Sequence, residues 1–164
     1  MEFNFNEIVR PHLFGSKSYQ SLRNSYLNQE MILLDANENP FGEYNRYPDA
    51  EHLQLKQKLA EINEVKSAQL FLGNGSDELS NLAMRIFCEP IQDSIIVFNP
   101  SFVMYEISAK LNNLGVEKLQ LNSDFQLEKE LFQEAILKTK AKILFLCSPN
   151  NPTGNSIDDL EFYI

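Results

Sequence analysis

Apolar residues in this chain fall into short continuous runs and into segments with helical spacing. The clearest run is Ile143–Cys147, five consecutive apolar residues bounded by turn-forming residues. A run this short fits a strand covered on both faces, as in a parallel sheet, better than it fits a helix. In the segment before it, Leu131, Ala135 and Ile136 share the spacing of one helix face. Strands that alternate with such helices predict βαβ units.

The same rhythm extends over most of the chain. We expect strands at residues 31–34, 70–72, 94–98, 117–121 and 143–147. We expect helices near residues 4–9, at 49–63 with Asp49 as N-cap, at 78–88, at 102–113 closed by Gly115, at 128–138, and after Ser156 as N-cap. The predicted fold class is therefore α/β, with helices flanking a mostly parallel sheet.

Two segments of different character are expected. Residues 1–30 form an irregular arm that is rich in Phe, Leu and Tyr, so we expect it to pack against another surface, such as a second copy of the chain. Residues 31–164 form the α/β domain. Its last apolar helical pattern reaches Ile164 without a stop signal, which predicts the N-terminal part of a longer protein.

Composition narrows the function classes. The chain has 164 residues, 43% of them hydrophobic, which suits one globular domain. A net charge of −9 argues against nucleic-acid binding, although backbone N–H groups could still hold an anion. Cys88 and Cys147 have no metal-site spacing, and two core cysteines predict a reduced, cytoplasmic protein. No signal peptide or membrane-spanning run is present in the sequence, so no membrane partner is expected.

Candidate chemistry lies in three loops, each at the carboxyl end of a predicted strand, where ligands of open α/β sheets bind. Residues 73–77 (Gly-Asn-Gly-Ser-Asp) open a helix whose first N–H groups could hold a phosphate. Phe102 and Tyr105 could stack on a planar ligand, and residues 148–154 (Ser-Pro-Asn-Asn-Pro-Thr-Gly) offer amide groups. Each loop also has a purely structural explanation. Residues 73–77 could be a glycine turn with a helix cap, Phe102 and Tyr105 could pack in the core, and residues 148–154 could be a turn without a ligand. A phosphate cradle, a ring and an amide together fit pyridoxal phosphate.

These loops also carry a family resemblance. With residues 34–42 (Leu-Asp-Ala-Asn-Glu-Asn-Pro-Phe-Gly) and 46–49 (Arg-Tyr-Pro-Asp), they resemble, in order, the N-terminal half of the histidinol-phosphate aminotransferases. That family is a branch of the class I/II, fold-type-I pyridoxal-phosphate aminotransferases. The resemblance covers nearly the whole chain. The motif at 148–154 marks the wider class, whereas the segments at 34–42 and 46–49 point to the histidinol-phosphate branch.

The resemblance implies a role for five residues around pyridoxal 5'-phosphate. Ser76 and Asp77 would hold the phosphate through backbone N–H groups. Phe102 would stack on the pyridine ring, a position at which many relatives have Tyr. Asn151 would hydrogen-bond the phenolic oxygen of the ring. Tyr47 would reach the cofactor phosphate of a partner subunit in a homodimer.

The resemblance further implies that Tyr19 and Asn37 lie near the substrate. It also implies that the arm, residues 1–30, packs on the other subunit of the homodimer. The implied reaction transfers an amino group between histidinol phosphate and 2-oxoglutarate, in histidine biosynthesis. In that family the lysine that forms the Schiff base lies beyond the matched region, so the resemblance implies that it follows Ile164. Lys142 stands at the wrong end of its strand to take that role. The 164-residue chain is therefore expected to contain only part of a fold-type-I large domain and to be inactive on its own.

Two other readings remain open. One is a related enzyme of the same branch, either an aromatic-amino-acid aminotransferase or a phosphate-ester decarboxylase. The other is a non-catalytic α/β module that binds a nucleotide. A nucleotide site would need an acidic residue about 20 residues after a Gly-rich loop, and the window after Gly75 offers Glu89 and Asp93 without a full fingerprint.

Overall fold

The structure is a computed structural model that describes residues 4–17, 32, 34, 36–139 and 141–164. The chain divides into two compact units, described separately here. Unit 1 comprises residues 1–15 and 73–164, and unit 2 comprises residues 16–72. The division proposed from the sequence, at residue 30, stays a prediction.

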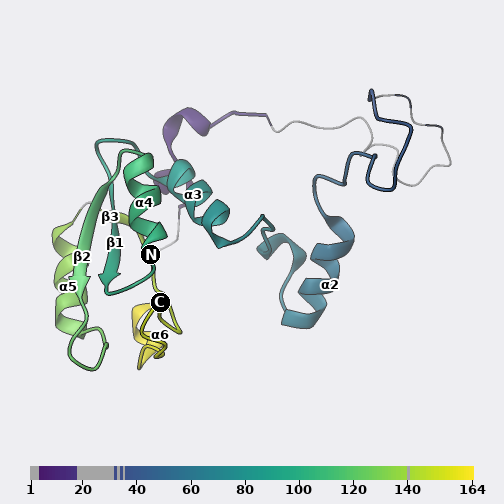
Figure 1. The fold of residues 1–164 in the computed structure, drawn as a ribbon. Coiled ribbons are helices and arrows are strands. Elements are labelled where there is room, and N and C mark those ends of the chain that lie inside the picture. Colours follow the sequence, from purple (N-terminus) through teal and green to yellow (C-terminus); the bar gives the residue numbers. More distant parts are fainter. Residues whose placement is uncertain (1–3, 18–31, 33, 35, 140) are drawn as a thin grey trace. The chain divides into compact units, whose positions relative to one another are not determined.

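Unit 1 contains a three-stranded parallel sheet in the order β2-β1-β3 (Figure 1). Its strands are β1 (Ser94–Asn99), β2 (Gly115–Gln120) and β3 (Ala141–Leu144). The flanking helices are α3 (Ser76–Phe87), α4 (Met104–Leu111) and α5 (Lys129–Lys138), and a short α6 (Leu160–Tyr163) follows. The α/β class, the parallel pairing and these three strands were all predicted by the hydrophobic pattern, and the structure confirms them.

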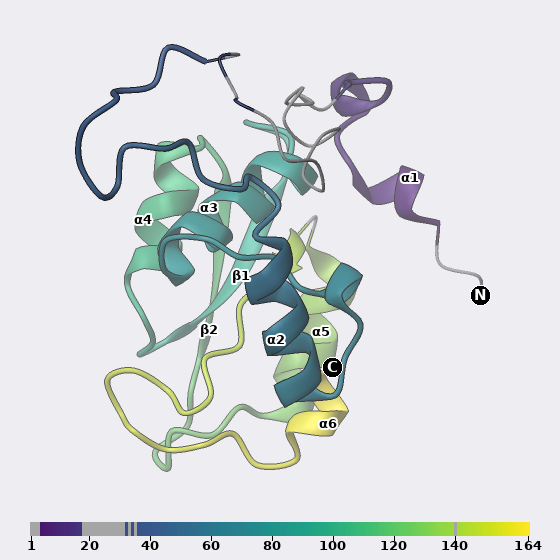
Figure 2. The same ribbon diagram turned by 90° about the vertical axis from the view of Figure 1, so that its right-hand side faces the viewer.

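Strand β1 is the centre of the unit because both of its faces are buried. Ile95 and Val97 pack with Met84 of α3 and Ala109 of α4, while Ile96 and Phe98 belong to a second cluster on the other face. That second cluster contains Leu119, Leu127, Phe132, Ala135, Ile157 and Tyr163. Successive strand residues point to opposite faces, so one continuous apolar run supports a layer of helices on each side (Figures 1 and 2).

The first described residues pack against α3 of the same chain. They form α1 (Phe5–Ile8) and a 3-10 turn, η1 (Pro11–Leu13). Arg10 donates its backbone N–H to the Ile86 carbonyl at 3.0 Å and its guanidinium to Glu89 at 3.0 Å. Val9 is buried and Phe5 meets Phe87 edge to face, whereas Phe5 and Phe14 stay about half exposed, so contact within unit 1 covers only part of the apolar surface of this segment.

Unit 2 contains α2 (Leu53–Asn63) and a 3-10 turn, η3 (Ser67–Gln69). The predicted helix start at Asp49 was four residues too early, because His52 has a left-handed backbone with φ +50°. Asp49 still serves the helix start. Its carboxylate accepts from Leu53 N–H at 2.8 Å and from Glu51 N–H at 2.9 Å, and these hydrogen bonds lower the pKa of Asp49.

Two predicted strands are absent where the structure describes them. Residues 32 and 34 are not in a strand, and residues 31 and 33 lie outside the described residues. Residues 70–72 are also irregular. The Leu70 N–H closes η3 by donating to the Ser67 carbonyl at 3.1 Å, so it cannot also donate to a neighbouring strand.

Three predicted element ends were also wrong. Helix α4 is closed by Asn113, whose φ is +57°, whereas Gly115 begins β2 and pairs with Ser94. The residue before α6 is Asp159, three positions after Ser156. Strand β3 ends at Leu144, although Phe145 still donates to the Ile96 carbonyl at 3.0 Å. Strand β3 is one of the two edge strands of the described sheet, and three of its four residues are half-buried.

Candidate functional site

The loop before α3 is shaped by two glycines. Gly75 has φ +88°, a conformation that favours glycine, and it forms the N-cap of α3. A Cβ atom at Gly73 would lie 2.6 Å from Leu79 Cδ2, so a side chain at this position would require the Leu79 side chain to move. The Glu78 carboxylate folds back and accepts from Asn74 N–H at 2.5 Å. The loop is thus held against the first turn of α3.

The first turn of α3 presents the predicted anion site. Ser76 and Asp77 are its first two residues, and both are exposed. N–H groups in a first helical turn have no carbonyl one turn earlier to accept from them, and the helix dipole adds positive potential there. The arrangement can therefore hold an anionic group through the backbone, even in a chain with a net charge of −9.

The loop after β1 carries the predicted stacking residue. Phe102 is half-buried and meets the edge of Tyr105, with ring centroids 5.4 Å apart and an interplanar angle of 82°. Tyr105 is itself stacked on Phe145, at 4.5 Å and 16°. Phe102 and Tyr105 therefore pack on each other, and Tyr105 also packs on Phe145, the residue that follows β3. Phe102 remains partly exposed to solvent.

Asn150 joins this loop to the loop after β3. Its side chain is buried, with 5% of the residue exposed. The amide group donates to the Pro100 carbonyl at 3.0 Å and to Thr153 Oγ1 at 2.8 Å, and its oxygen accepts from Ser101 Oγ at 2.9 Å. The Asn-Asn pair in the sequence signals amide chemistry but does not say which asparagine is structural.

Asn151 has the opposite environment. It is exposed, and its side-chain amide makes no hydrogen bond to any other residue in the described part of the chain. The loop that carries it has cis peptide bonds before Pro149 and Pro152. Buried Asn150 therefore fixes the loop, and its neighbour Asn151 presents a free amide to solvent.

Unit 1 contains four of the predicted site residues: Ser76 and Asp77 at the start of α3, Phe102 after β1 and Asn151 in the loop after β3. Because residues 70–72 form no strand, the prediction that the loop before α3 lies at the carboxyl end of a strand was wrong. Asn37 and Tyr47 belong to unit 2, where both line a shallow hollow of about 260 Å³ together with Arg46. There the Tyr47 N–H donates to the Glu38 carboxylate at 2.7 Å. Tyr19 lies outside the described residues.

The two cysteines differ in environment. Cys88 is buried against Met84 and Ile95, and burial raises its pKa to about 11, with the Asp93 charge adding to the effect. Cys147 was predicted to lie inside a buried strand, but it follows the end of β3 and is half-buried. Both are free thiols. The described residues contain no group of His, Cys, Asp and Glu that could hold a metal ion.

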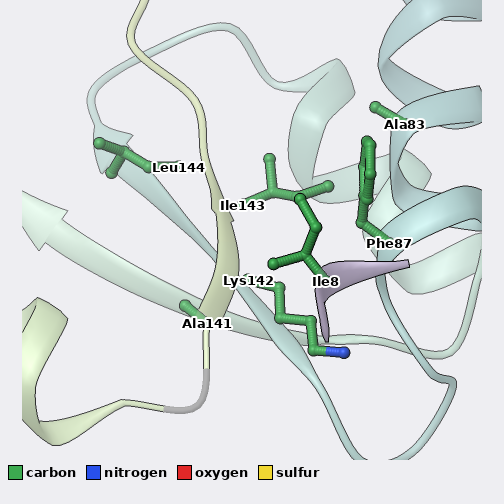
Figure 3. A pocket seen from close by; sticks show the side chains of 7 residues that line it. All are labelled: Ile8, Ala83, Phe87, Ala141, Lys142, Ile143 and Leu144. Atoms are coloured by element: carbon green, nitrogen blue, oxygen red, sulfur yellow. The ribbon is translucent and has the colours of Figure 1, made fainter. Parts of the chain in front are cut away.

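A second hollow of about 610 Å³ lies at the other end of unit 1, between α1, α3 and β3 (Figure 3). Ile8, Phe87 and Ile143 face it, and its lining is mainly apolar. Lys142 stands at its margin and pairs with Asp93 at 3.1 Å. This hollow has no counterpart of the phosphate cradle, so it is not a candidate cofactor site.

None of the described helices is long and apolar enough to cross a membrane.

Comparison with known proteins gives a consistent result. Residues 14–161 match the sequence profile of the family described as Aminotransferase class I and II. A histidinol-phosphate aminotransferase from Parabacteroides distasonis is 43% identical over 161 residues, which are 98% of this chain and 46% of the relative. The chain therefore spans about half the length of the curated relatives it matches.

Solved structures agree with the sequence match. The histidinol-phosphate aminotransferase from Clostridium acetobutylicum has a TM-score of 0.61 at 26% identity, over 71% of this chain and 33% of that protein. The enzyme of the same name from Sinorhizobium meliloti, solved in complex with pyridoxal-5'-phosphate, has a TM-score of 0.61 over 67% of this chain and 29% of that one. Its 22% identity bears on the fold alone.

Proposed function

Because this chain belongs to the class I and II aminotransferase family, we propose that it forms part of the cofactor-binding domain of a histidinol-phosphate aminotransferase. The full protein would transfer an amino group between histidinol phosphate and 2-oxoglutarate, with pyridoxal 5'-phosphate as cofactor. The observation that carries the proposal is that one compact unit holds the exposed first turn of α3, the half-buried Phe102 of the loop after β1 and the exposed Asn151 of the loop after β3.

The residues present fit this cofactor at three points. The exposed first turn of α3 suits a phosphate, with Ser76 and Asp77 as the N–H donors. The partly open ring of Phe102 suits stacking on a pyridine. The unpaired amide of Asn151 suits hydrogen bonding to a ring oxygen. When bound, the cofactor withdraws electrons from the bonds of the amino-bearing carbon, and these residues orient it.

Acid–base chemistry at that carbon needs an amine, and among the described lysines Lys142, the one nearest in sequence to Asn151, is not placed to supply it. Lys142 precedes Ile143 near the amino end of β3 and is paired with Asp93, which precedes β1. The amino ends of parallel strands lie at the opposite edge of the sheet from the loops of Phe102 and Asn150. We therefore assign the proton-transferring lysine to the part of the full protein that lies outside these 164 residues.

The substrate assignment predicts a clear difference between two proteins. The full-length protein is expected to convert histidinol phosphate with 2-oxoglutarate, whereas the 164-residue chain is expected to show no turnover above the rate of free cofactor. A coupled glutamate assay on both proteins checks this. Phenylalanine, tested as donor at equal concentration, is the control. A strong preference for phenylalanine would favour an aromatic-amino-acid aminotransferase, and turnover by the 164-residue chain would contradict the missing-lysine argument.

The assembly and location follow from the same proposal. We assign a cytoplasmic homodimer in which Tyr47 reaches the cofactor phosphate of the partner subunit, while Asn37 and Tyr19 face the substrate. Support for this comes from the family and from the shared hollow of Asn37 and Tyr47 in unit 2. The exposed aromatic rings of Tyr44 (97% exposed) and Tyr47 (65% exposed) are available for a partner surface in that unit.

A further inference from the structure

Tyr105 occupies the centre of an aromatic cluster beside the candidate site. It lies in the first turn of α4, one ring face is stacked on Phe145, and its ring meets Phe102 edge to face. Phe145 continues the pairing of β3 with β1, so its backbone is fixed by the sheet. Tyr105 therefore connects a rigid strand exit to the ring of Phe102, which lies on a loop.

The environment of the Tyr105 hydroxyl keeps it uncharged. Burial raises the pKa of Tyr105, and Cys147 and the Asp77 carboxylate raise it further, so the hydroxyl stays protonated at neutral pH. The ring is thus uncharged and is held in place by its stacking on Phe145.

We propose that Tyr105 is a positioning residue for the cofactor: its ring, fixed on Phe145, holds the Phe102 ring at the orientation that stacks on a pyridine. This inference rests on the proposed cofactor site and gives Tyr105 a positioning role in place of the direct stacking that the sequence suggested for it. Tyr105 itself touches Phe102 and not the cofactor. An edge-to-face pair of this kind restricts the tilt of the second ring, because the edge of one ring is attracted to the face of the other.

A double-mutant cycle tests whether Tyr105 acts through Phe102. The variants are Tyr105→Leu, Phe102→Leu and the double variant of the 164-residue chain. The ligand is pyridoxamine 5'-phosphate, whose amine forms no Schiff base with lysines, and its fluorescence gives the dissociation constant. Each single change is expected to weaken binding about five- to tenfold. The double variant is expected to bind no more weakly than Phe102→Leu, because Tyr105 has nothing to position once the Phe102 ring is gone.

Two further variants separate positioning from general loss of structure. Tyr105→Phe keeps the ring and is expected to bind within about twofold of the unchanged chain, which restores what Tyr105→Leu loses. Phe5→Leu breaks a different edge-to-face contact, that of Phe5 with Phe87 at the far end of α3, and is expected to leave binding unchanged. Unfolding curves of all variants identify any that are not folded at the assay temperature.

The outcomes are distinct. Additive losses in the cycle, or a loss in Tyr105→Phe equal to that in Tyr105→Leu, would overturn the positioning role while leaving the cofactor site intact. Failure of the unchanged chain to bind pyridoxamine 5'-phosphate would overturn the proposed cofactor site, and the role of Tyr105 with it.

Discussion

Replacing Ser76 with proline is expected to weaken binding of pyridoxamine 5'-phosphate by about ten- to a hundredfold. Ser76 is the first residue of α3, and proline there removes one N–H donor while keeping a backbone that starts a helix. Gly75, with ψ +164°, has the extended ψ that a residue before proline prefers. A hydrogen bond to a charged group contributes about 1.5–3 kcal/mol, which corresponds to this range of affinity. Fluorescence titration measures the change.

Ser76→Ala is the matched control for that experiment. It removes the hydroxyl but keeps the N–H group, so it is expected to lose much less affinity than Ser76→Pro. The free energy of unfolding of both variants is expected to lie within about 0.5 kcal/mol of that of the unchanged chain, because neither change removes a buried contact. Equal affinities for the two variants would show that the backbone N–H of Ser76 does not hold the phosphate.

Replacing Asn150 with alanine is expected to lower the free energy of unfolding by about 2–4 kcal/mol. The change removes three side-chain hydrogen bonds and leaves the Pro100 carbonyl and Ser101 Oγ without this buried partner. It also separates the two loops that carry Phe102 and Asn151. Urea unfolding followed by circular dichroism, with the slope held to the value of the unchanged chain, measures the effect.

The neighbouring asparagine provides the control. Asn151 is exposed and its amide is unpaired within the described residues, so Asn151→Ala is expected to change the free energy of unfolding by less than about 0.5 kcal/mol. The same variant is expected to weaken cofactor binding, because it removes the amide proposed to face the ring oxygen. Equal destabilisation by the two changes would contradict the division between a structural Asn150 and a ligand-facing Asn151.

Sequence patterns predicted the centre of the fold better than its margins. The apolar run of β1 and the amphipathic helices α3 and α5 were placed within about two residues, because burial on both faces of a sheet leaves a strong periodic signal. The segment 70–72 has the same composition as a strand, yet it forms none. Its apolar residues give no information on whether a neighbouring strand is available to pair with it.

The candidate site was predicted in the same uneven way. The loops of Ser76 and Phe102 were found because glycines and helix starts have local signatures, but the strand predicted before Ser76 does not form. The buried role of Asn150 and the stacking of Tyr105 on Phe145 were not found. Both depend on contacts between segments about 40 to 50 residues apart, which no local pattern encodes.

The central claim is that the first turn of α3 binds the phosphate of a pyridoxal-type cofactor. The most direct test compares binding of pyridoxamine 5'-phosphate and pyridoxamine to the unchanged 164-residue chain by fluorescence titration. The ring is the same in both ligands, so the difference in affinity reports the phosphate alone. The account predicts that the phosphorylated ligand binds at least about thirtyfold more tightly, through two charge-assisted hydrogen bonds. Equal affinities, or no binding of either ligand, would contradict it.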